Sequence, residues 1–326
     1  MNTRPLGNWG LQATEVGLGC WQIGGGWGAP WSDATAQEIL AAAYDAGVRF
    51  FDTADGYGDG ESELSLGRFR RSHPDIVIAT KLGRSGGLYP DNYSEEGLRA
   101  ATLSSIKSLG VDRIDLTQLH CVPTEVLRQG SVFDWLRKQR DEGLISAFGA
   151  SVESVEEGLI CLEQEGLTSL QVIFNIFRQK PAEELLPAAK EKGVGIIVRL
   201  PLASGLLTGK LSKSTVFGEG DHRNFNRDGQ AFNVGETFAG IRYEKGVELS
   251  EELSEYVPEG MNMVQMALRW ILDHDAVTTV IPGASSPRQA KSNATAAELA
   301  PLPEALHKQL RQWYEEKVRQ EIRGPY

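Results

Sequence analysis

The chain has 326 residues, of which 41% are apolar and 24% charged, and its formal net charge is −11. A chain of this size can bury a large core without disulfides, and its acidity argues against a nucleic-acid binder, which needs a basic face. No apolar run approaches the roughly 18 to 20 residues that cross a membrane, and the N-terminus has no signal-peptide pattern.

The three cysteines, Cys20, Cys121 and Cys161, include no C-x-x-C pair. We therefore expect neither a disulfide framework nor a metal site, and we expect a reduced, cytoplasmic compartment. We expect no nucleic-acid partner and no membrane partner. The sequence does not indicate an oligomeric state.

Short apolar runs alternate with helical stretches along the chain. Residues up to about 14 predict a hairpin that covers one end of the fold. Near-continuous apolar runs are typical of parallel strands covered on both faces. The predicted strands are residues 15–19, 48–51, 76–79, 114–119, 145–149, 170–174, 194–200 and 277–281.

Helices are predicted between these strands, most of them followed by a glycine. They span residues 33–46 after the cap Ser32, 94–109, 133–142 and 181–192. Eight strands in βα order predict a TIM (β/α)8 barrel made by a single domain over residues 1–326, with a doubly wound sheet as the rival architecture. The segment 205–258 after the seventh strand is predicted to be a long lid or binding loop.

Polar side chains stand at the ends of three consecutive predicted strands. Asp52 follows the strand 48–51, Lys81 comes just after 76–79, and His120 follows 114–119, while Tyr57 lies five residues beyond Asp52. Catalytic residues of TIM barrels gather at this end of the strands. A nearby ammonium lowers the pKa of a phenol, so that Tyr57 could give or take a proton near neutral pH, and a histidine could orient a carbonyl oxygen.

Taken singly, each of these residues has an ordinary explanation as a helix cap, a surface charge, a packing ring or a structural histidine. Together they resemble the aldo-keto reductase family, whose motifs are matched in order by FFDTADGYG, ATKLG and LTQLH. The resemblance implies that Tyr57 is the general acid/base, that Lys81 and Asp52 tune it, and that His120 orients the carbonyl.

The same resemblance implies an NADP(H) site, with NAD(H) as the alternative. PLASGLLTGK is similar to the segment that lies over the pyrophosphate, and VIPGASSPRQAKSN to the segment at the adenosine end, where small residues let backbone N–H groups approach a phosphate. Ser151 and Gln171 match positions that hold the nicotinamide carboxamide. The implied cofactor residues are Ser151, Gln171, Arg199, Pro201, Leu202, Ser204, Gly205, Leu207, Lys210, Gly283, Ala284, Ser285, Gln289 and Asn293.

Several positions depart from the family pattern. Val152 stands where an asparagine is usual, Arg199 near the place of an aromatic ring that stacks on nicotinamide, and Gln289 and Ser292 at frequent arginine and glutamate positions. A guanidinium can also stack on a ring. These departures leave the preference between the two cofactors open.

Trp21 and Trp27 are the expected substrate-binding residues besides Tyr57 and His120, because aromatic walls suit aldehyde, sugar or ring substrates. The predicted function is hydride transfer between NAD(P)H and a carbonyl. One alternative is a cofactor-binding regulatory subunit of the same fold with little turnover. Another is a Schiff-base aldolase using Lys81, which would leave Tyr57 and the phosphate segment unexplained.

Overall fold

The computed structural model describes residues 1–25, 31–85 and 87–326. Its main sheet has eight parallel strands that neighbour one another in chain order, β3 to β10. Bridges from Val16 to Val280 and from Gly19 to Gly283 join the first strand to the last. The strands are β3 (Leu18–Gly19), β4 (Phe50–Asp52), β5 (Val77–Leu82), β6 (Ile114–His120), β7 (Ile145–Ser151), β8 (Ser169–Ile173), β9 (Gly195–Arg199) and β10 (Val277–Val280).

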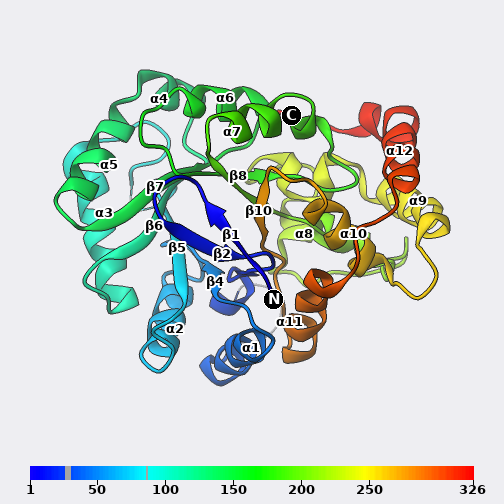
Figure 1. Cartoon of the computed structure of the whole chain (residues 1–326), viewed down its shortest axis with the longest axis horizontal. Helices are drawn as coiled ribbons and strands as arrows, with labels where there is room; N and C mark the ends of the chain where they lie inside the picture. Colours follow the sequence, from blue (N-terminus) through cyan, green and yellow to red (C-terminus); the bar gives the residue numbers. More distant parts are fainter. Residues whose placement is uncertain (26–30, 86) are drawn as a thin grey trace.

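The predicted (β/α)8 barrel is therefore confirmed, and the doubly wound sheet is wrong because its two edges would remain apart. Helices surround the barrel in Figure 1. None of the helices in the described residues is long and apolar enough to cross a membrane. The helices are α1 (Asp33–Asp45), α2 (Glu61–Arg70), α3 (Glu95–Leu109), α4 (Thr124–Gln129), α5 (Ser131–Asp141), α6 (Val155–Leu162), α7 (Leu185–Glu191), α8 (His222–Phe225), α9 (Tyr243–Leu253), α10 (Met263–Leu272), α11 (Pro287–Ala294) and α12 (Glu304–Trp313).

The predicted N-terminal hairpin is also confirmed. Strands β1 (Thr3–Leu6) and β2 (Leu11–Thr14) pair antiparallel and contact β9 and β10. Figure 1 shows this hairpin lying across one end of the barrel. Leu6 and Ala13 are buried in one apolar cluster with the inward-facing Phe50 of β4, so the hairpin seals the N-terminal end of the strands.

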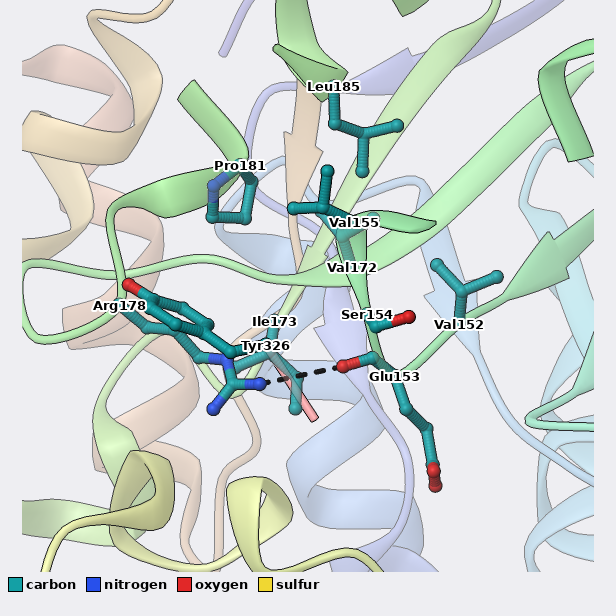
Figure 2. Close-up of a pocket in the computed structure, with 10 residues that line it drawn as sticks. All are labelled: Val152, Glu153, Ser154, Val155, Val172, Ile173, Arg178, Pro181, Leu185 and Tyr326. Atoms are coloured by element: carbon teal, nitrogen blue, oxygen red, sulfur yellow. Dashed lines mark hydrogen bonds between the residues drawn. The ribbon is translucent and has the colours of Figure 1, made fainter. Parts of the chain in front are cut away.

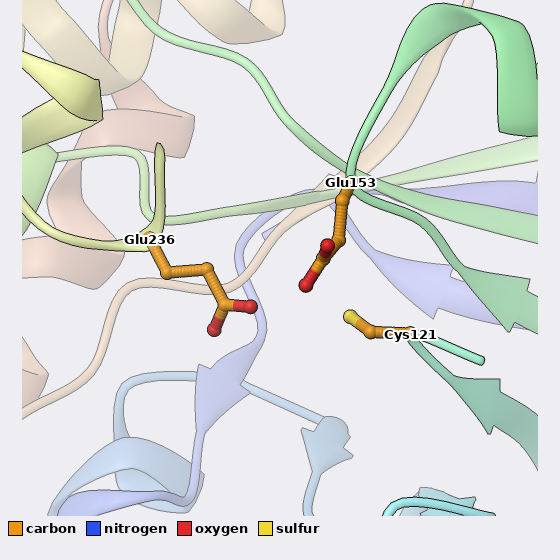
Figure 3. A group of neighbouring side chains, drawn as sticks. All are labelled: Cys121, Glu153 and Glu236. Carbon is orange, nitrogen blue, oxygen red and sulfur yellow. The ribbon is translucent and has the colours of Figure 1, made fainter. Parts of the chain in front are cut away.

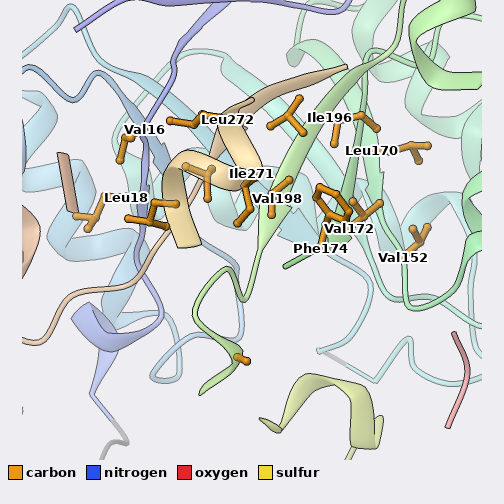
Figure 4. Packing of buried hydrophobic residues seen from close by; sticks show 14 of the residues in the cluster. Val16, Leu18, Val152, Leu170, Val172, Phe174, Ile196, Val198, Ile271 and Leu272 are labelled. Atoms are coloured by element: carbon orange, nitrogen blue, oxygen red, sulfur yellow. The ribbon is translucent and has the colours of Figure 1, made fainter. Parts of the chain in front are cut away.

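Side chains alternate between the two faces of each strand. On β9, Ile197 belongs to the small cluster inside the barrel, whereas Ile196 and Val198 belong to the large cluster under the helices. Figure 4 shows Ile196 and Val198 beside Leu170 of β8 and Ile271 of α10. The same alternation turns every second residue of β4, β5, β6 and β8 into the barrel.

Two of the sequence-based expectations about helices need correction. The helix predicted over residues 181–192 is interrupted: a 3-10 turn at Lys180–Ala182 precedes α7, which begins at Leu185. This start places Pro187 in the first turn of α7, where a missing backbone N–H costs no hydrogen bond. Ser32 precedes α1 but makes no side-chain capping bond, whereas Ser94 accepts one from Gly97 N–H at α3.

The segment 205–258 was expected to be a long loop, but it contains two helices and several 3-10 turns. It follows β9, the seventh strand of the barrel, as predicted. Helix α9 buries Tyr243, Val247 and Leu253, so this part of the chain is anchored by its own apolar face. The turns at Val234–Glu236 and Phe238–Gly240 precede α9 and lie nearer the mouth of the barrel.

Candidate active site

A layer of polar side chains lies inside the barrel above the apolar floor. Phe50, Ala79 and Leu116 point inward from β4, β5 and β6. Two residues further along each strand, the same face carries Asp52, Lys81 and Gln118, and His120 follows on β6. Asp52, Lys81 and His120 therefore lie among the last residues of their strands rather than after them, one or two residues from where the sequence predicts the strand ends.

Lys81 is the centre of this layer. Its Nζ donates to Asp52 Oδ1 over 2.5 Å, to the Thr53 carbonyl oxygen over 2.8 Å, and to the Tyr57 hydroxyl oxygen over 3.1 Å. The Lys81 and Asp52 side chains are 1% and 3% exposed, so the ion pair is shielded from water. The structure thus brings together the four residues that the sequence singled out, because the Tyr57 ring also stands edge-on to His120 with ring centroids 5.8 Å apart.

The charges of these groups follow from burial and from their neighbours. Burial lowers the pKa of Lys81, but Asp52 and Tyr57 outweigh burial and leave that pKa raised, so Lys81 is an ammonium. Burial lowers the pKa of His120 far below its usual range, and the nearby cations Lys81, Arg84 and Arg199 lower it further. His120 is therefore a neutral imidazole at neutral pH.

Tyr57 differs from the expectation of a phenol brought near neutrality. Lys81 does lower the pKa of Tyr57, as predicted, but burial raises it by more, and the net pKa is above its usual value. Tyr57 is therefore protonated at neutral pH, and its hydroxyl can donate a proton. The Tyr57 ring also contacts Trp21, which stacks on it at a centroid distance of 5.9 Å.

A cavity of about 810 Å³ extends from this polar layer to the start of α11. Most of the predicted site residues line it, namely Trp21, Asp52, Tyr57, Lys81, His120, Ser151, Gln171, Arg199, Pro201, Leu202, Ser204, Gly205, Lys210, Gly283, Ser285, Gln289 and Asn293. Leu207 and Ala284 do not line it, since their side chains are buried in the hydrophobic core. Trp27 lies outside the described residues.

The residues along this cavity fit a dinucleotide. Leu200, Ala203 and Ser204 all have positive φ angles of 47° to 55°, an arrangement that non-glycine residues adopt mainly at functional sites. At the other end, Gln289 Oε1 accepts from both the backbone N–H and the hydroxyl of Ser285. The cavity joins these two segments to Lys81 and Tyr57 without interruption, as a cofactor with a reactive ring at one end requires.

Two arginines and two glutamates form a charged cluster: Arg84, Arg199 and Glu236 line the cavity, and Glu153 lies behind them, 3.6 Å from Arg84. Arg84 Nη1 donates to Glu236 Oε1 over 3.0 Å, and Arg199 Nη1 lies 3.4 Å from Glu236 Oε2. Burial raises the pKa of Glu236, but Arg199 and Arg84 outweigh it and lower that pKa, while burial and the Glu236 carboxylate raise the pKa of Glu153 to about 7. Arg199 is thus held by an ion pair rather than free to move.

Cys121 completes this cluster, and Figure 3 shows its sulfur facing the Glu153 and Glu236 carboxylates. The Sγ atom and one carboxylate oxygen from each glutamate lie within 4.8 Å of one another, a spacing that a metal ion could bridge. Arg84 and Arg199 already bring two positive charges to Glu236. Burial raises the pKa of the Cys121 thiol to about 11, so at neutral pH it is not a thiolate ligand.

Arg178 binds the backbone of Glu153. Figure 2 shows the Arg178 guanidinium reaching the Glu153 carbonyl oxygen, at a distance of 3.5 Å, beside the ring of Tyr326. Arg178 also donates to the carbonyl oxygens of Ala239 and Pro325. One buried guanidinium therefore joins the turn after β7, the segment before α9 and the last residues of the chain.

Several residues that line the cavity were missed by the sequence analysis, among them Gln22, Asp55, Arg84, His222, Arg223, Phe232, Glu236 and Asn262. Arg84 lies only three residues after Lys81, so proximity to that motif could have indicated it. Phe232 and Glu236 lie in the segment 205–258, which has no periodic pattern near them. Arg223 also forms an ion pair with Asp221, with 2.5 Å between Nη2 and Oδ2.

Residues 15–315 match the sequence profile described as the aldo/keto reductase family. The chain belongs to this family. The identification made from the motifs is thereby confirmed, and with it the prediction of an oxidoreductase that uses a nicotinamide cofactor. The family also accounts for the barrel and for the order of the motifs along the chain.

Curated relatives align over nearly their whole length. The chain is 31% identical to D-threo-aldose 1-dehydrogenase of Pseudomonas sp. (92% of this chain, 94% of the relative). It is 27% identical to NADH-specific methylglyoxal reductase of Escherichia coli strain K12 (92% and 94%), and 29% identical to a probable voltage-gated potassium channel subunit beta of Oryza sativa subsp. japonica (94% and 95%). The solved structure of the glycerol dehydrogenase of Gluconobacter oxydans superposes with a TM-score of 0.78 at 27% identity (99% and 98%).

Proposed function

We propose that this protein moves a hydride between NADP(H) and the carbonyl carbon of an aldehyde, ketone or sugar, with Tyr57 as the general acid/base. The observation that carries the proposal is the 3.1 Å contact of the Lys81 ammonium with the Tyr57 hydroxyl, inside the cavity that also contains His120. A proton donor, a cation beside it and a neutral imidazole are what reduction of a carbonyl requires.

The chain's own residues have separable roles in this proposal. Tyr57 O–H donates its proton to the carbonyl oxygen as negative charge develops there. Lys81 stabilises the phenolate that remains, and Asp52 keeps the lysine charged and in place. His120, being neutral, donates one N–H to the same oxygen and orients it. The nicotinamide ring, when bound, would supply or accept the hydride.

The proposed cofactor site runs along the residues that line the cavity from Ser151 and Gln171 to Lys210 and Asn293. We propose NADP(H), with NAD(H) as the alternative, because Arg288 and the hydroxyl of Ser286, which accepts from Gln289 N–H and keeps its own proton, stand at the start of α11 and could donate to an added phosphate. The relative named an NADH-specific methylglyoxal reductase supports NAD(H) as the alternative. The Michaelis constants for NADPH and NADH decide between them, and a much lower constant for NADH would refute the preference.

The proposed substrate pocket is bounded by Trp21, Tyr57 and His120, with Trp27 retained as a sequence-based prediction. Trp21 and Phe232 provide an apolar wall, while Arg84 and Glu236 provide polar groups that can bind hydroxyls. Relatives named for an aldose, methylglyoxal and glycerol support a small, oxygen-rich substrate. A mixed wall of this kind suits such compounds better than long aliphatic aldehydes.

The direct test is a screen of aldehydes, ketones and sugars with both cofactors, followed at the nicotinamide absorbance band. The wild-type protein should turn over at least one carbonyl, and Tyr57→Phe should lose at least about 100-fold in kcat, since general acid catalysis contributes about that much. Tyr44→Phe, at a surface tyrosine bonded to Asp75, is the matched control. Full activity of Tyr57→Phe would refute the assigned role.

A cofactor-binding regulatory subunit is the second candidate, and the relative named as a potassium channel subunit favours it. Such a protein would bind NADPH tightly and turn over slowly with every carbonyl. The Schiff-base aldolase is disfavoured by the Lys81–Asp52 ion pair, because an ammonium is not a nucleophile. Borohydride should therefore trap no substrate adduct on Lys81.

We also propose that the chain folds as one domain over residues 1–326 and acts in the cytoplasm. All three cysteines are free and buried, as a reducing compartment allows. Limited proteolysis should yield no stable fragment that retains only part of the barrel, and cell fractionation should recover the protein without detergent.

A further inference from the structure

Strand β6 sends three side chains into the barrel, at Leu116, Gln118 and His120. Leu116 belongs to the apolar floor, and His120 lines the cavity. Gln118 lies between them, is completely buried, and is not part of the cavity wall. A buried carboxamide that reaches neither solvent nor the cavity must form its hydrogen bonds with other groups of the protein.

The partner of Gln118 is the carboxylate that holds the catalytic lysine. Gln118 Nε2 donates to Asp52 Oδ2 over 3.0 Å, while Lys81 occupies the other oxygen, Oδ1, at 2.5 Å. Gln171 Nε2 donates to the same Oδ2 over 2.8 Å and lies 3.3 Å from Gln118 Oε1. Asp52 thus accepts one ionic and two neutral hydrogen bonds, and the two amides are themselves linked.

We propose that Gln118 is a positioning residue for catalysis: it fixes the Asp52 carboxylate so that Oδ1 keeps the Lys81 ammonium against the Tyr57 hydroxyl. The proposal rests on the proposed role of Tyr57. Gln118 contacts no substrate or cofactor atom in this arrangement and acts only through Asp52. Oδ2 is turned toward the two amides, and Oδ1 is left for the lysine alone.

The expected effect on Tyr57 has a definite sign. The charged groups that act on Tyr57 are Lys81 and Arg199, which lower its pKa, and Asp52, which raises it. Removing the Gln118 donor leaves the Asp52 charge less compensated and its Oδ2 held by Gln171 alone, so that Oδ1 holds the Lys81 ammonium less firmly against the Tyr57 hydroxyl. Both changes raise the pKa of Tyr57, so that the phenolate forms at higher pH.

The test is the titration of Tyr57 in the free protein, followed by phenolate absorbance and corrected with matching Tyr57→Phe backgrounds. Gln118→Met keeps the side-chain length without a donor and should move the titration upward by about 0.5 to 1 pH unit. Gln139→Met is the matched control, because Gln139 is also buried and neither of its amide atoms has a hydrogen-bond partner among the described residues. It should leave the titration unchanged.

Kinetics separate the positioning role from a purely structural one. Gln118→Met should lower kcat about tenfold, with the alkaline limb of carbonyl reduction displaced as the titration is, and should leave the dissociation constant for NADPH within about twofold. Gln118→Glu is the second variant: when protonated it can still donate to Asp52, and when ionised it repels that carboxylate. It should therefore approach wild-type activity at acidic pH and lose activity earlier as the pH rises.

A Tyr57 titration that coincides with that of the wild type in a folded Gln118→Met, or in Gln118→Glu should the first variant not fold, would overturn the proposal. That outcome is independent of whether the wild-type protein reduces any carbonyl. Absence of turnover in the wild type would instead refute the proposed function, while the titration would still report on Gln118.

Discussion

Arg84 and Glu236 lie 152 residues apart in the sequence, yet Arg84 Nη1 donates to Glu236 Oε1 over 3.0 Å beside the catalytic cavity. The Arg84 guanidinium also lies over the ring of Phe232, 5.6 Å from its centroid. One side chain after β5 therefore holds two cavity-lining residues of the segment that follows β9. The shape of the pocket depends on a contact between two distant parts of the chain.

Arg84→Met should release this segment. We expect the KM for the carbonyl substrate to rise about tenfold with a smaller change in kcat, and the free energy of unfolding to fall by about 1 to 3 kcal/mol, because a partly buried charged hydrogen bond is lost. Steady-state kinetics and urea unfolding measure both. Arg128→Met removes an exposed pair with Glu156 and should cost at most about 0.5 kcal/mol. Equal effects of the two variants would contradict the assignment.

The pH dependence should follow Tyr57. Its pKa is raised by burial, so the proton-donating form persists through neutral pH and disappears only in alkaline solution. Carbonyl reduction should therefore be flat from about pH 6 to about pH 8 and decline above, whereas alcohol oxidation, which needs the phenolate, should increase over that alkaline range. Because the pKa of His120 is strongly lowered, His120 should add no acidic limb. A decline of reduction between about pH 6 and about pH 8 would disagree with both assignments.

Much of the fold could be predicted because a barrel repeats one local pattern. Apolar runs located the strands to within a few residues, and the motifs indicated Asp52, Tyr57, Lys81 and His120. The strand alternation then explains why Asp52, Lys81 and His120 face inward. Glu236 could not be predicted, since its placement depends on ion pairs with Arg84 and Arg199 that have no local signature. Gln118 stands inside a matched motif, but only the structure shows what it contacts.

Helix α10 offers a test of local stability. Asn262 Oδ1 accepts from Gln265 N–H, and Gln265 Oε1 accepts from Asn262 N–H, both over 3.0 Å. This reciprocal pair satisfies two backbone donors at the start of a helix that is mostly buried. Asn262→Ala should lower the free energy of unfolding by about 1 kcal/mol. Ser32→Ala is the matched control, since Ser32 precedes α1 without a side-chain capping bond, and it should change stability much less.

Gly58 determines where Tyr57 lies. Its φ angle is +60°, and a Cβ at this position would come within 1.9 Å of the Gly24 carbonyl oxygen, a backbone atom that cannot rotate away. Gly58→Ala must therefore move the loop after β4 and with it the Tyr57 hydroxyl, which we expect to lower kcat by about 100-fold.

The control for Gly58→Ala is Gly110→Ala, because Gly110 ends α3 with a φ of +64° and a Cβ there would meet no atom of the described residues within 4 Å. Both variants bear the same strain of a left-handed alanine, about 1 kcal/mol, so both should lose similar stability from that source. Only Gly58→Ala also meets the Gly24 backbone. Thermal unfolding and kcat, measured on both variants, separate the effect of backbone strain from that of loop displacement. A loss of kcat in Gly58→Ala alone would support the contact with Gly24 as the constraint on the position of Tyr57. Equal kcat values for the two variants would refute it.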